Sequence, residues 1–472
     1  MEIHDTTPVS ELRPTLTRLR DAWQASRPDY SQRRDDLQRL RSVLKRRLDE
    51  MASTIAEDFG HRSLHESRIA DGMAVLNEID HLCKHLRGWM KPKKVGSGWR
   101  FWPARAEIRP EPVGVVGVIS PWNYPVNLAL APLATAIAAG NHVYLKPSEH
   151  TPKTSAFLHD LLTEVFPADR VAMATGADDV GAEFSALPFD HLVFTGSTSV
   201  GRKVMEAAAR NLTPLTLELG GKSPAVICPG YPVQRAAQRL ATGKWFNAGQ
   251  TCIAPDYVLV EASQLIPLVQ ALRHEALTRY GAFDQPQDYT RIINEAQYRR
   301  LRGYLDDARQ RGLEVIELAT IDSRVAERER LIVPTLVLEP GDDARLMQEE
   351  IFGPILPIKT YDSLDEAIAY INHHDRPLAL YPFGDKREDI DTILRNTLAG
   401  GVTVNDTLLH FAISNLPFGG IGPSGMGAYH ARAGFDAMSK QLPILWQPRR
   451  AGSDLLKPPY AKVQRFIDFI VR

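Results

Sequence analysis

Residues 112–120 read Pro-Val-Gly-Val-Val-Gly-Val-Ile-Ser, and this apolar run constrains the fold more than any other stretch. A strand with one solvated face alternates apolar and polar residues, whereas a strand buried on both faces does not. The run therefore predicts a central strand of a parallel sheet. A small-residue helix over 129–140 and a second apolar strand over 142–145 follow it, which is the order of an α/β fold.

The second half of the chain repeats this alternation. Strands are predicted over 257–260 and 331–338, and helices over 267–280 and 297–310. With 472 residues, the chain has room for two or three domains. We therefore expect two α/β units in one chain.

The N-terminal region has leucines at helical spacing. One helix is predicted around Leu12 to Trp23 and a longer one over 37–55, with Ser31 as its N-cap. The many charged residues of the second helix, Arg33 and Asp36 among them, are interpreted as a solvated face rather than an anion site.

Residues 91–110 are rich in proline, glycine and aromatic residues, which favours a strand or hairpin arm over a helix. Trp99, Phe101 and Trp102 on such an arm need covering. The arm therefore predicts a partner subunit.

Composition excludes several classes of protein. A net charge of -1 gives no bulk attraction to nucleic acid or to an anionic membrane. Three widely spaced cysteines argue against a disulfide framework, and no cluster of cysteine and histidine has zinc spacing, so no metal site is expected. The N-terminus lacks the pattern of a secretory signal, and no apolar run is long enough to span a membrane. We expect a cytoplasmic protein.

Two stretches carry groups suited to covalent catalysis. Cys252 ends the sequence Phe-Asn-Ala-Gly-Gln-Thr-Cys, and Glu218 lies in Thr-Leu-Glu-Leu-Gly-Gly-Lys-Ser-Pro, between apolar residues. A thiolate is a nucleophile, and a partly desolvated carboxylate has the raised pKa that a general base needs. Cysteine and carboxylate together suggest acyl chemistry followed by hydrolysis.

Other candidate residues follow predicted strands. Asn123 lies in Pro-Trp-Asn-Tyr-Pro after the first strand, where its amide is either an oxyanion donor or an ordinary turn residue. Lys146 and Glu149 follow the strand over 142–145. Residues 191–201 read as strand, glycine turn and helix start, an arrangement that brings a helix N-terminus close to a pyrophosphate.

These motifs resemble the aldehyde dehydrogenase superfamily, which carries F-x-N-x-G-Q-x-C, L-E-L-G-G-K, P-W-N-Y/F-P, K-P-S-E, F-T-G-S-T-x-V-G and E-x-F-G-P. The run Gly-Gln-Thr-Cys-Ile-Ala-Pro-Asp-Tyr looks like the class 3 branch, which includes coniferyl aldehyde dehydrogenases. The resemblance covers nearly the whole chain. It implies a Rossmann-like NAD-binding domain (1–90 and 111–217), a second α/β catalytic domain (218–438), a β oligomerisation arm (91–110 and 439–450) and a C-terminal tail (451–472).

The resemblance also implies a role for each matching residue. Cys252 would be the nucleophile, Glu218 the base and Asn123 the oxyanion donor. The residues expected to bind the cofactor are Trp122, Lys146, Glu149, Gly196, Ser197, Gly201, Glu350 and Phe352, with Glu350 at the nicotinamide ribose and Phe352 at the nicotinamide ring. The charge of Glu149 would repel a 2′-phosphate and so favours NAD, although class 3 relatives that accept both cofactors leave NADP open.

The expected activity is NAD-dependent oxidation of an aldehyde to a carboxylic acid by a homodimer. Four aromatic residues are expected near the substrate funnel: Tyr124, Trp245, Phe246 and Phe411. They suit an apolar aldehyde, which is either aromatic, such as coniferyl aldehyde, or long and aliphatic. The glycine-rich segment 416–430 is expected to be a turn region of the second domain that helps line this funnel. His410 is either a substrate contact or a packed residue.

Two other interpretations remain open. A cysteine hydrolase or esterase would need a histidine beside Cys252, with His410 as a spatial candidate, and a non-catalytic relative would need none of these groups. The apolar stripe Val463, Phe466, Ile467 and Ile470 predicts a tail helix that binds a membrane surface or docks on the protein itself.

Overall fold

The computed structural model describes residues 6–281, 283, 287–449, 451 and 457–471. The structure does not describe residues 1–5, which are part of the segment interpreted as lacking a signal. It also leaves out residues 452–456 and 472 of the tail and the side chains of Phe466 and Ile470. Among the described residues, no helix combines the length and the apolar character needed to cross a bilayer.

A six-stranded sheet forms the first α/β unit, in the order β15-β7-β6-β3-β4-β5. Its strands β7 to β5 are parallel, which confirms the central buried strand predicted over 112–120. The strands are β3 (Val115–Ile119), β4 (His142–Lys146), β5 (Val171–Met173), β6 (His191–Thr195), β7 (Leu215–Glu218) and β15 (Gly425–Met426).

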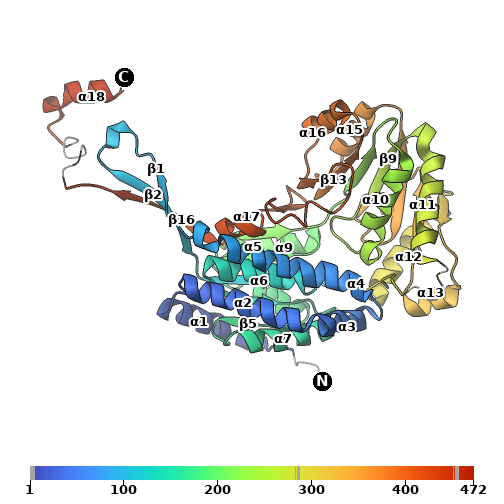
Figure 1. The fold of residues 1–472 in the computed structure, drawn as a ribbon, viewed down its shortest axis with the longest axis horizontal. Helices are drawn as coiled ribbons and strands as arrows, with labels where there is room; N and C mark the ends of the chain where they lie inside the picture. The colour runs from blue at the N-terminus through green and yellow to red at the C-terminus, as the bar shows by residue number, and fades with distance from the viewer. Residues whose placement is uncertain (1–5, 282, 284–286, 450, 452–456, 472) are drawn as a thin grey trace.

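Helices cover both faces of this sheet (Figure 1). In one group, α6 packs against α2, α5 and α17, and α7 packs against α2 and α3. In the other group, α1 packs against β4 and α8, and α8 packs against α9. The helices are α1 (Val9–Ala25), α2 (Tyr30–Arg46), α3 (Leu48–Phe59), α4 (Leu64–Ser67), the π-helical η1 (Arg68–Met73), α5 (Ala74–Trp89), α6 (Asn127–Ala139), α7 (Pro152–Val165), α8 (Asp178–Ser185), α9 (Thr198–Ala209) and α17 (Ala431–Ala437).

A seven-stranded sheet forms the second unit, in the order β10-β11-β12-β9-β8-β13-β14, and only β10 is antiparallel. Its strands are β8 (Pro224–Ile227), β9 (Tyr257–Glu261), β10 (Glu314–Glu317), β11 (Thr335–Leu338), β12 (Ile355–Tyr361), β13 (Ala379–Phe383) and β14 (Gly401–Val402). Its helices are α10 (Val233–Trp245), α11 (Leu265–Tyr280), α12 (Glu295–Gln310), α13 (Ser323–Glu329), α14 (Arg345–Gln348), α15 (Leu364–His373) and α16 (Arg387–Asn396). The two sheets confirm the α/β class with a Rossmann-like first unit.

A three-stranded antiparallel sheet of β1 (Lys93–Val95), β2 (Arg105–Pro112) and β16 (Ser439–Trp446) extends away from both units, with α18 (Gln464–Val471) beyond its end (Figure 1). Trp99, Phe101 and Trp102 are exposed on it, as are Leu445 and Trp446. Phe469 of α18 contacts the ring of Trp99 edge to face, with ring centroids 5.9 Å apart.

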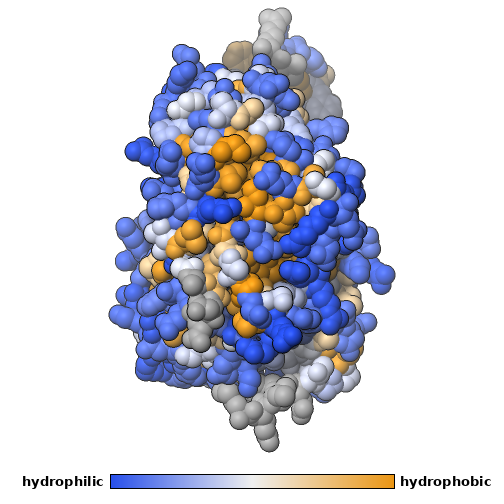
Figure 2. Space-filling view, turned by 90° about the vertical axis from the view of Figure 1, so that its right-hand side faces the viewer, coloured by the Kyte–Doolittle hydropathy of each residue, from blue (hydrophilic) through white to orange (hydrophobic). Residues whose placement is uncertain are grey.

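The opposite end of the molecule also exposes apolar groups. Figure 2 shows this end, on the side of α11 and α12, with apolar side chains gathered in a band across the middle of the face. Helix α11 exposes Ile266 and Leu277. This surface lies away from the arm.

The predicted long N-terminal helix was wrong in three respects. Asp29, not Ser31, is the N-cap, because its carboxylate accepts a hydrogen bond from the Gln32 backbone N–H at 2.9 Å. The chain breaks at Arg47 into α2 and α3. The charged face is not all solvated, since Arg33 is buried against the carbonyls that end α6, and Asp36 is buried against Arg170.

The segment 416–430 also differs from its expected place. It returns to the six-stranded sheet, where β15 pairs with β7, and α17 packs against α6. The range 218–438 therefore includes residues that belong structurally to the first sheet. Sequence order could not reveal this return, because β15 is only two residues long.

Candidate active site

A cavity of about 210 Å³ lies where the two sheets meet, and both Glu218 and Cys252 line it. Most of its wall is apolar. Helix α6 contributes Leu128 and Ala131, the segment η1–α5 contributes Ile69, Ala70, Met73 and Ala74, and loops contribute Phe246, Phe411 and Phe418. A cavity of this kind, apolar with a few convergent polar groups, is the usual form of a small-molecule site.

Cys252 follows a loop that is held rigidly. Asn247 and Ala248 both have positive φ, at 52° and 51°, a conformation that needs support from the surroundings. The backbone N–H of Asn247 donates to the half-buried Glu66 carboxylate at 3.0 Å, and the Gln250 side chain donates to the Asn247 carbonyl. These contacts fix the direction in which the next residues present the thiol.

The Cys252 thiol is neutral in this state of the protein. Burial, with the nearby charges of Glu350 and Glu218, raises its pKa to about 12. A thiol is a weak nucleophile, so catalysis at this residue needs a base that takes its proton.

Glu218 is placed to be such a base. It is the last residue of β7 and only 3% exposed, and neither of its carboxyl oxygens has a hydrogen-bond partner among the described residues. Burial raises its pKa well above the ordinary value. A buried carboxyl without partners is unfavourable unless function requires it, because its desolvation is uncompensated.

Asn123 lies beside the Cys252 loop but not in the cavity wall. Its side-chain amide donates to the Gln250 carbonyl at 3.2 Å, and its own carbonyl accepts from Arg62 at 3.0 Å and from Asn247 at 3.1 Å. Arg62 is fully buried and paired with Asp71 at 3.1 Å. The residue is therefore firmly positioned next to the loop, while the cavity itself is lined by its neighbour Tyr124.

The strands β3, β4, β6 and β7 are parallel neighbours, so the residues after them gather at one edge of the sheet. Open α/β sheets bind ligands at this edge. The turn after β6 contains Gly196, and Ser197 caps α9 by accepting from the Val200 N–H. Gly201 is required by packing, because a Cβ there would strike Leu219. The N-terminus of α9 is exposed and suits an anionic group.

The remaining residues expected at the cofactor lie along the same edge. Lys146 is buried at the end of β4, and its ammonium donates to Glu149 at 3.1 Å. The rings of Trp122 and Phe352 meet edge to face, with centroids 5.3 Å apart. These groups are of the kinds that a dinucleotide requires. The α9 N-terminus suits an anionic group, the Lys146–Glu149 pair suits ribose hydroxyls, and the Trp122–Phe352 pair suits a flat ring.

Glu350 takes an unexpected position. Its carboxyl lies where a side chain at Gly220 would begin, and it accepts from the Gly221 backbone N–H. Burial, reinforced by the charge of Asp256, raises its pKa to about 8. Only a glycine at position 220 leaves room for this contact.

The aromatic wall was predicted correctly for Tyr124, Phe246 and Phe411, which line the cavity. The prediction was wrong for Trp245, which is fully buried at the end of α10 and is absent from the wall. His410 is the packed alternative, because its ring bonds the Thr403 hydroxyl at 2.8 Å and burial lowers its pKa to about 4. It does not pair with Cys252 as a hydrolase would require.

The expectation that the segment 416–430 helps line the funnel is confirmed, because Phe418, Tyr429 and His430 line the cavity. Glu78 on α5 also lines it and was missed. The Tyr429 hydroxyl is buried and has no partner among the described residues. Glu78 lies in an ordinary helical pattern, so no sequence signal could have placed it here.

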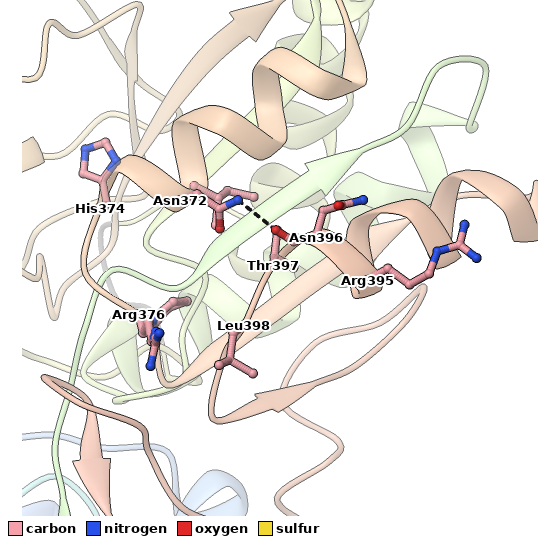
Figure 3. Close-up of a pocket in the computed structure, with 9 residues that line it drawn as sticks. Asn372, His374, Arg376, Arg395, Asn396, Thr397 and Leu398 are labelled. Atoms are coloured by element: carbon pink, nitrogen blue, oxygen red, sulfur yellow. Dashed lines mark hydrogen bonds between the residues drawn. The ribbon is translucent and has the colours of Figure 1, made fainter.

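A second pocket lies on the surface at the C-terminal ends of α15 and α16 (Figure 3). Asn372 donates there to the Asn396 carbonyl at 2.8 Å, while Arg376 and Arg395 point in different directions. No cysteine or carboxylate lines it. Glu218 and Cys252 both line the first cavity, and no group of side chains suited to hold a metal ion occurs in the described ranges.

Comparison with known proteins identifies the family of the chain. Residues 17–442 match the model of the aldehyde dehydrogenase family. The chain is 46% identical to a probable coniferyl aldehyde dehydrogenase of Pseudomonas aeruginosa, over 97% of this chain and 96% of that one. Among solved structures, the substrate-bound AldH of Staphylococcus aureus superposes with a TM-score of 0.93 at 36% identity, covering 99% of this chain and 100% of that chain. Betaine aldehyde dehydrogenase of Staphylococcus aureus in complex with NAD+ superposes with a TM-score of 0.86 at 26% identity, covering 94% and 89%. The chain belongs to the aldehyde dehydrogenase family.

Proposed function

We propose that this enzyme oxidises an apolar aldehyde to the carboxylic acid with NAD, using Cys252 as the nucleophile and Glu218 as the base. One observation carries the proposal: a buried carboxyl without partners and a cysteine thiol line a single apolar cavity. Two such groups can share covalent and hydrolytic steps, which a binding protein does not need.

The first step is attack of Cys252 on the aldehyde carbon. Because burial holds the thiol neutral, its proton must leave as the carbon–sulfur bond forms, and Glu218 is the carboxyl in the same cavity that can accept it. The oxyanion that develops on the former carbonyl oxygen needs a hydrogen-bond donor. We assign this role to the Asn123 side chain together with the backbone N–H of Cys252, which requires a small rotation of Asn123 away from Gln250.

Bound NAD would supply the hydride acceptor. Gly196, Ser197 and Gly201 would hold its pyrophosphate at the α9 N-terminus, and Lys146 and Glu149 the adenosine ribose. Trp122, Glu350 and Phe352 would hold the nicotinamide end. The six-stranded sheet would thus bind most of the cofactor, the segment before β12 would contact its nicotinamide end, and the loop before β9 would supply the nucleophile.

The last step is hydrolysis of the thioester left on Cys252. Glu218 has both oxygens free, so it can orient a water molecule and take its proton as the water attacks the acyl carbon. The carboxylic acid then leaves, and Cys252 recovers its proton. The carboxylate would be dispensable if the acyl group were passed to a thiol instead of water.

The arm supports a homodimer. Phe101 and Trp102, with Leu445 and Trp446, are large apolar side chains exposed on the arm. A second copy related by a twofold axis would cover the same surface on both partners.

The direct test is to mix the protein with NAD and an aldehyde, and to follow the absorbance of the reduced cofactor. Cinnamaldehyde and a medium-chain aliphatic aldehyde should both give NADH, and the carboxylic acid should appear in equal amount. Hydrolysis of an activated ester without any NAD-dependent oxidation would favour a cysteine hydrolase instead.

A further inference from the structure

Tyr429 carries a buried hydroxyl that the mechanism above does not use. The residue is only 1% exposed and lines the cavity, and its hydroxyl has no hydrogen-bond partner among the described residues. Leaving such a group unpaired lowers the stability of the fold, because its desolvation is not compensated. A phenylalanine would fill the same space without this cost, so packing does not explain the hydroxyl.

Other buried tyrosines have partners for this group. The Tyr124 hydroxyl, in the same cavity wall, bonds the Thr251 hydroxyl, and the Tyr361 hydroxyl donates to the Ile227 carbonyl at 2.6 Å. A hydroxyl left open at a cavity wall is instead placed to bind a molecule that enters the cavity.

The pairing of β15 with β7 holds Tyr429 close to Glu218. Gly425 in β15 is the partner of Glu218 in this pairing, and the Leu219 backbone N–H donates to the Ser424 carbonyl at 3.1 Å. Tyr429 follows Gly425 by only four residues, and its side chain lines the same cavity as Glu218. The two side chains therefore reach one space from neighbouring segments of the six-stranded sheet.

The charges that act on the hydroxyl are those of the reacting groups. Burial raises the pKa of Tyr429 well above its ordinary value, and the negative charges of Glu218, Cys252 and Glu78 raise it further. Neighbouring charges have this effect only at short range. Tyr429 is therefore a neutral phenol near Glu218 and Cys252, which can hold a hydrogen bond but is not a base.

Glu218 has the same unmet capacity for hydrogen bonds. Both of its carboxyl oxygens are buried without a partner among the described residues, and Tyr429 does not bond either of them. Buried polar groups of this kind are usually satisfied by water. The cavity of about 210 Å³ has room for a water molecule beside a substrate, since water takes up about 30 Å³ in the liquid.

We infer that Tyr429 is a further catalytic residue, whose hydroxyl oxygen binds the water molecule that Glu218 activates. The inference rests on the proposed function and concerns its last step. One hydrogen of the water bonds to Glu218 and the other to the Tyr429 oxygen. This leaves a lone pair of the water oxygen free to attack the acyl carbon on Cys252.

The hydrolytic step balances with these groups alone. The water oxygen bonds to the acyl carbon while one water proton moves to Glu218. The carbon–sulfur bond then breaks and leaves the carboxylic acid and the Cys252 thiolate, which recovers the proton from Glu218. Tyr429 keeps its own proton at every stage, so its contribution is to orient the water.

Tyr429→Phe tests the inference, because it removes the hydroxyl and keeps the ring. The NAD-bound protein, in excess over cinnamaldehyde, is mixed with this aldehyde and quenched with acid at set times. NADH should form at the wild-type rate, since Glu218 is still present to take the Cys252 proton. Intact-protein mass follows the acyl group on Cys252, which should leave roughly tenfold to hundredfold more slowly than in the wild type.

Hydroxylamine gives a readout that a structural role would not produce. It attacks a thioester without the help of an oriented water, and with limiting aldehyde it is added when no free aldehyde remains. The wild-type and Tyr429→Phe acyl-enzymes should then give the hydroxamate at equal rates, although their hydrolysis differs. The variant should also be at least as stable to heat as the wild type, because the lost hydroxyl had no partner.

Tyr361→Phe is the matched control. Its hydroxyl is also buried, but it is bonded to the Ile227 carbonyl and does not line the cavity. This change should lower the midpoint of thermal unfolding and leave acyl release unaltered. Slow acyl release in both variants, or NADH formation and acyl release that slow by the same factor in Tyr429→Phe, would overturn the inference.

The remaining outcomes separate this inference from the proposed function. If the wild type forms NADH and Tyr429→Phe releases the acyl group at the normal rate, the inference is wrong while the proposed function stands. If no aldehyde yields NADH with the wild type, both are wrong. Should Tyr429→Phe fail to fold, a crystal structure of the wild type decides. A water within hydrogen-bond distance of the Tyr429 oxygen and a Glu218 oxygen supports the inference, and no water at that position overturns it.

Discussion

Glu218 and Cys252 line the same cavity, although Glu218 ends a strand of the six-stranded sheet and Cys252 lies in a loop that leads into the seven-stranded sheet. The site therefore exists only where the two units meet. Any change that moves one unit relative to the other should affect catalysis before it affects the fold of either.

Cys252→Ala should abolish aldehyde oxidation, because no other cysteine lines the cavity. NAD binding should remain close to that of the wild type, since Cys252 is not among the residues assigned to the cofactor. Steady-state NADH formation and NAD titration by fluorescence measure the two properties. Cys228→Ala, a change at a buried cysteine outside the cavity, should keep the activity. Substantial turnover by Cys252→Ala would remove this residue from the role of nucleophile.

Glu149→Gln should improve the use of NADP relative to NAD. The change removes a negative charge from the site assigned to the ribose, and a 2′-phosphate would no longer be repelled. The measurement is the ratio of kcat/KM for the two cofactors at one fixed aldehyde concentration. Glu183→Gln on α8 removes the same charge elsewhere and should leave the ratio unaltered. An unchanged ratio in Glu149→Gln would contradict the assignment of Lys146 and Glu149.

Arg62→Met should destabilise the protein by about 3–5 kcal/mol, because it leaves Asp71 as a buried charge without its partner. Denaturant unfolding measures the loss, and the double change Arg62→Met with Asp71→Asn should recover much of it, because the amide oxygen still accepts from the Val126 and Asn127 backbone N–H groups. The double variant should still be a poor enzyme, since the Asn123 carbonyl has lost its bond from Arg62. Equal stability of the single and double variants would show that the pair is not coupled.

Leu445→Glu should convert a dimer into a monomer of 52.6 kDa, because it places a charge in the apolar surface of the arm. Light scattering after size exclusion gives the mass directly. Leu277→Glu is the matched control, a similarly exposed leucine on α11 at the other end of the molecule. A wild type that is already a monomer at micromolar concentration would contradict the proposed dimer.

Much of the fold could be predicted because its signals are local. The apolar run at 112–120, the glycine turn at Gly196 and the aromatic arm each specify their own structure. The break at Arg47 and the burial of Arg33 could not be predicted, since both depend on the helix ends that α2 packs against.

Some residues of the site could likewise be predicted from the sequence, and others could not. The motifs around Glu218 and Cys252 singled out two residues that the structure brings into one cavity, because each motif is a short sequence. Glu78 was missed because it becomes a wall residue only when α5 folds over α6. Trp245 was misplaced for the opposite reason: its position next to Phe246 suggested a shared role, but the end of α10 turns it into the core.

The central claim is that Glu218 activates the water that releases the product from Cys252, and rapid mixing of Glu218→Gln with NAD and aldehyde tests it most directly. The change keeps the shape of the side chain and removes the base. Where the Cys252 proton can leave without Glu218, hydride transfer still occurs once while water attack on the thioester becomes slow, and the account predicts a burst of about one NADH per site followed by a weak steady state. Intact-protein mass should then show the acyl group on Cys252. If Glu218 is also the only base that deprotonates Cys252, the burst itself slows and no adduct forms. Normal steady-state turnover by Glu218→Gln would contradict both forms of the account.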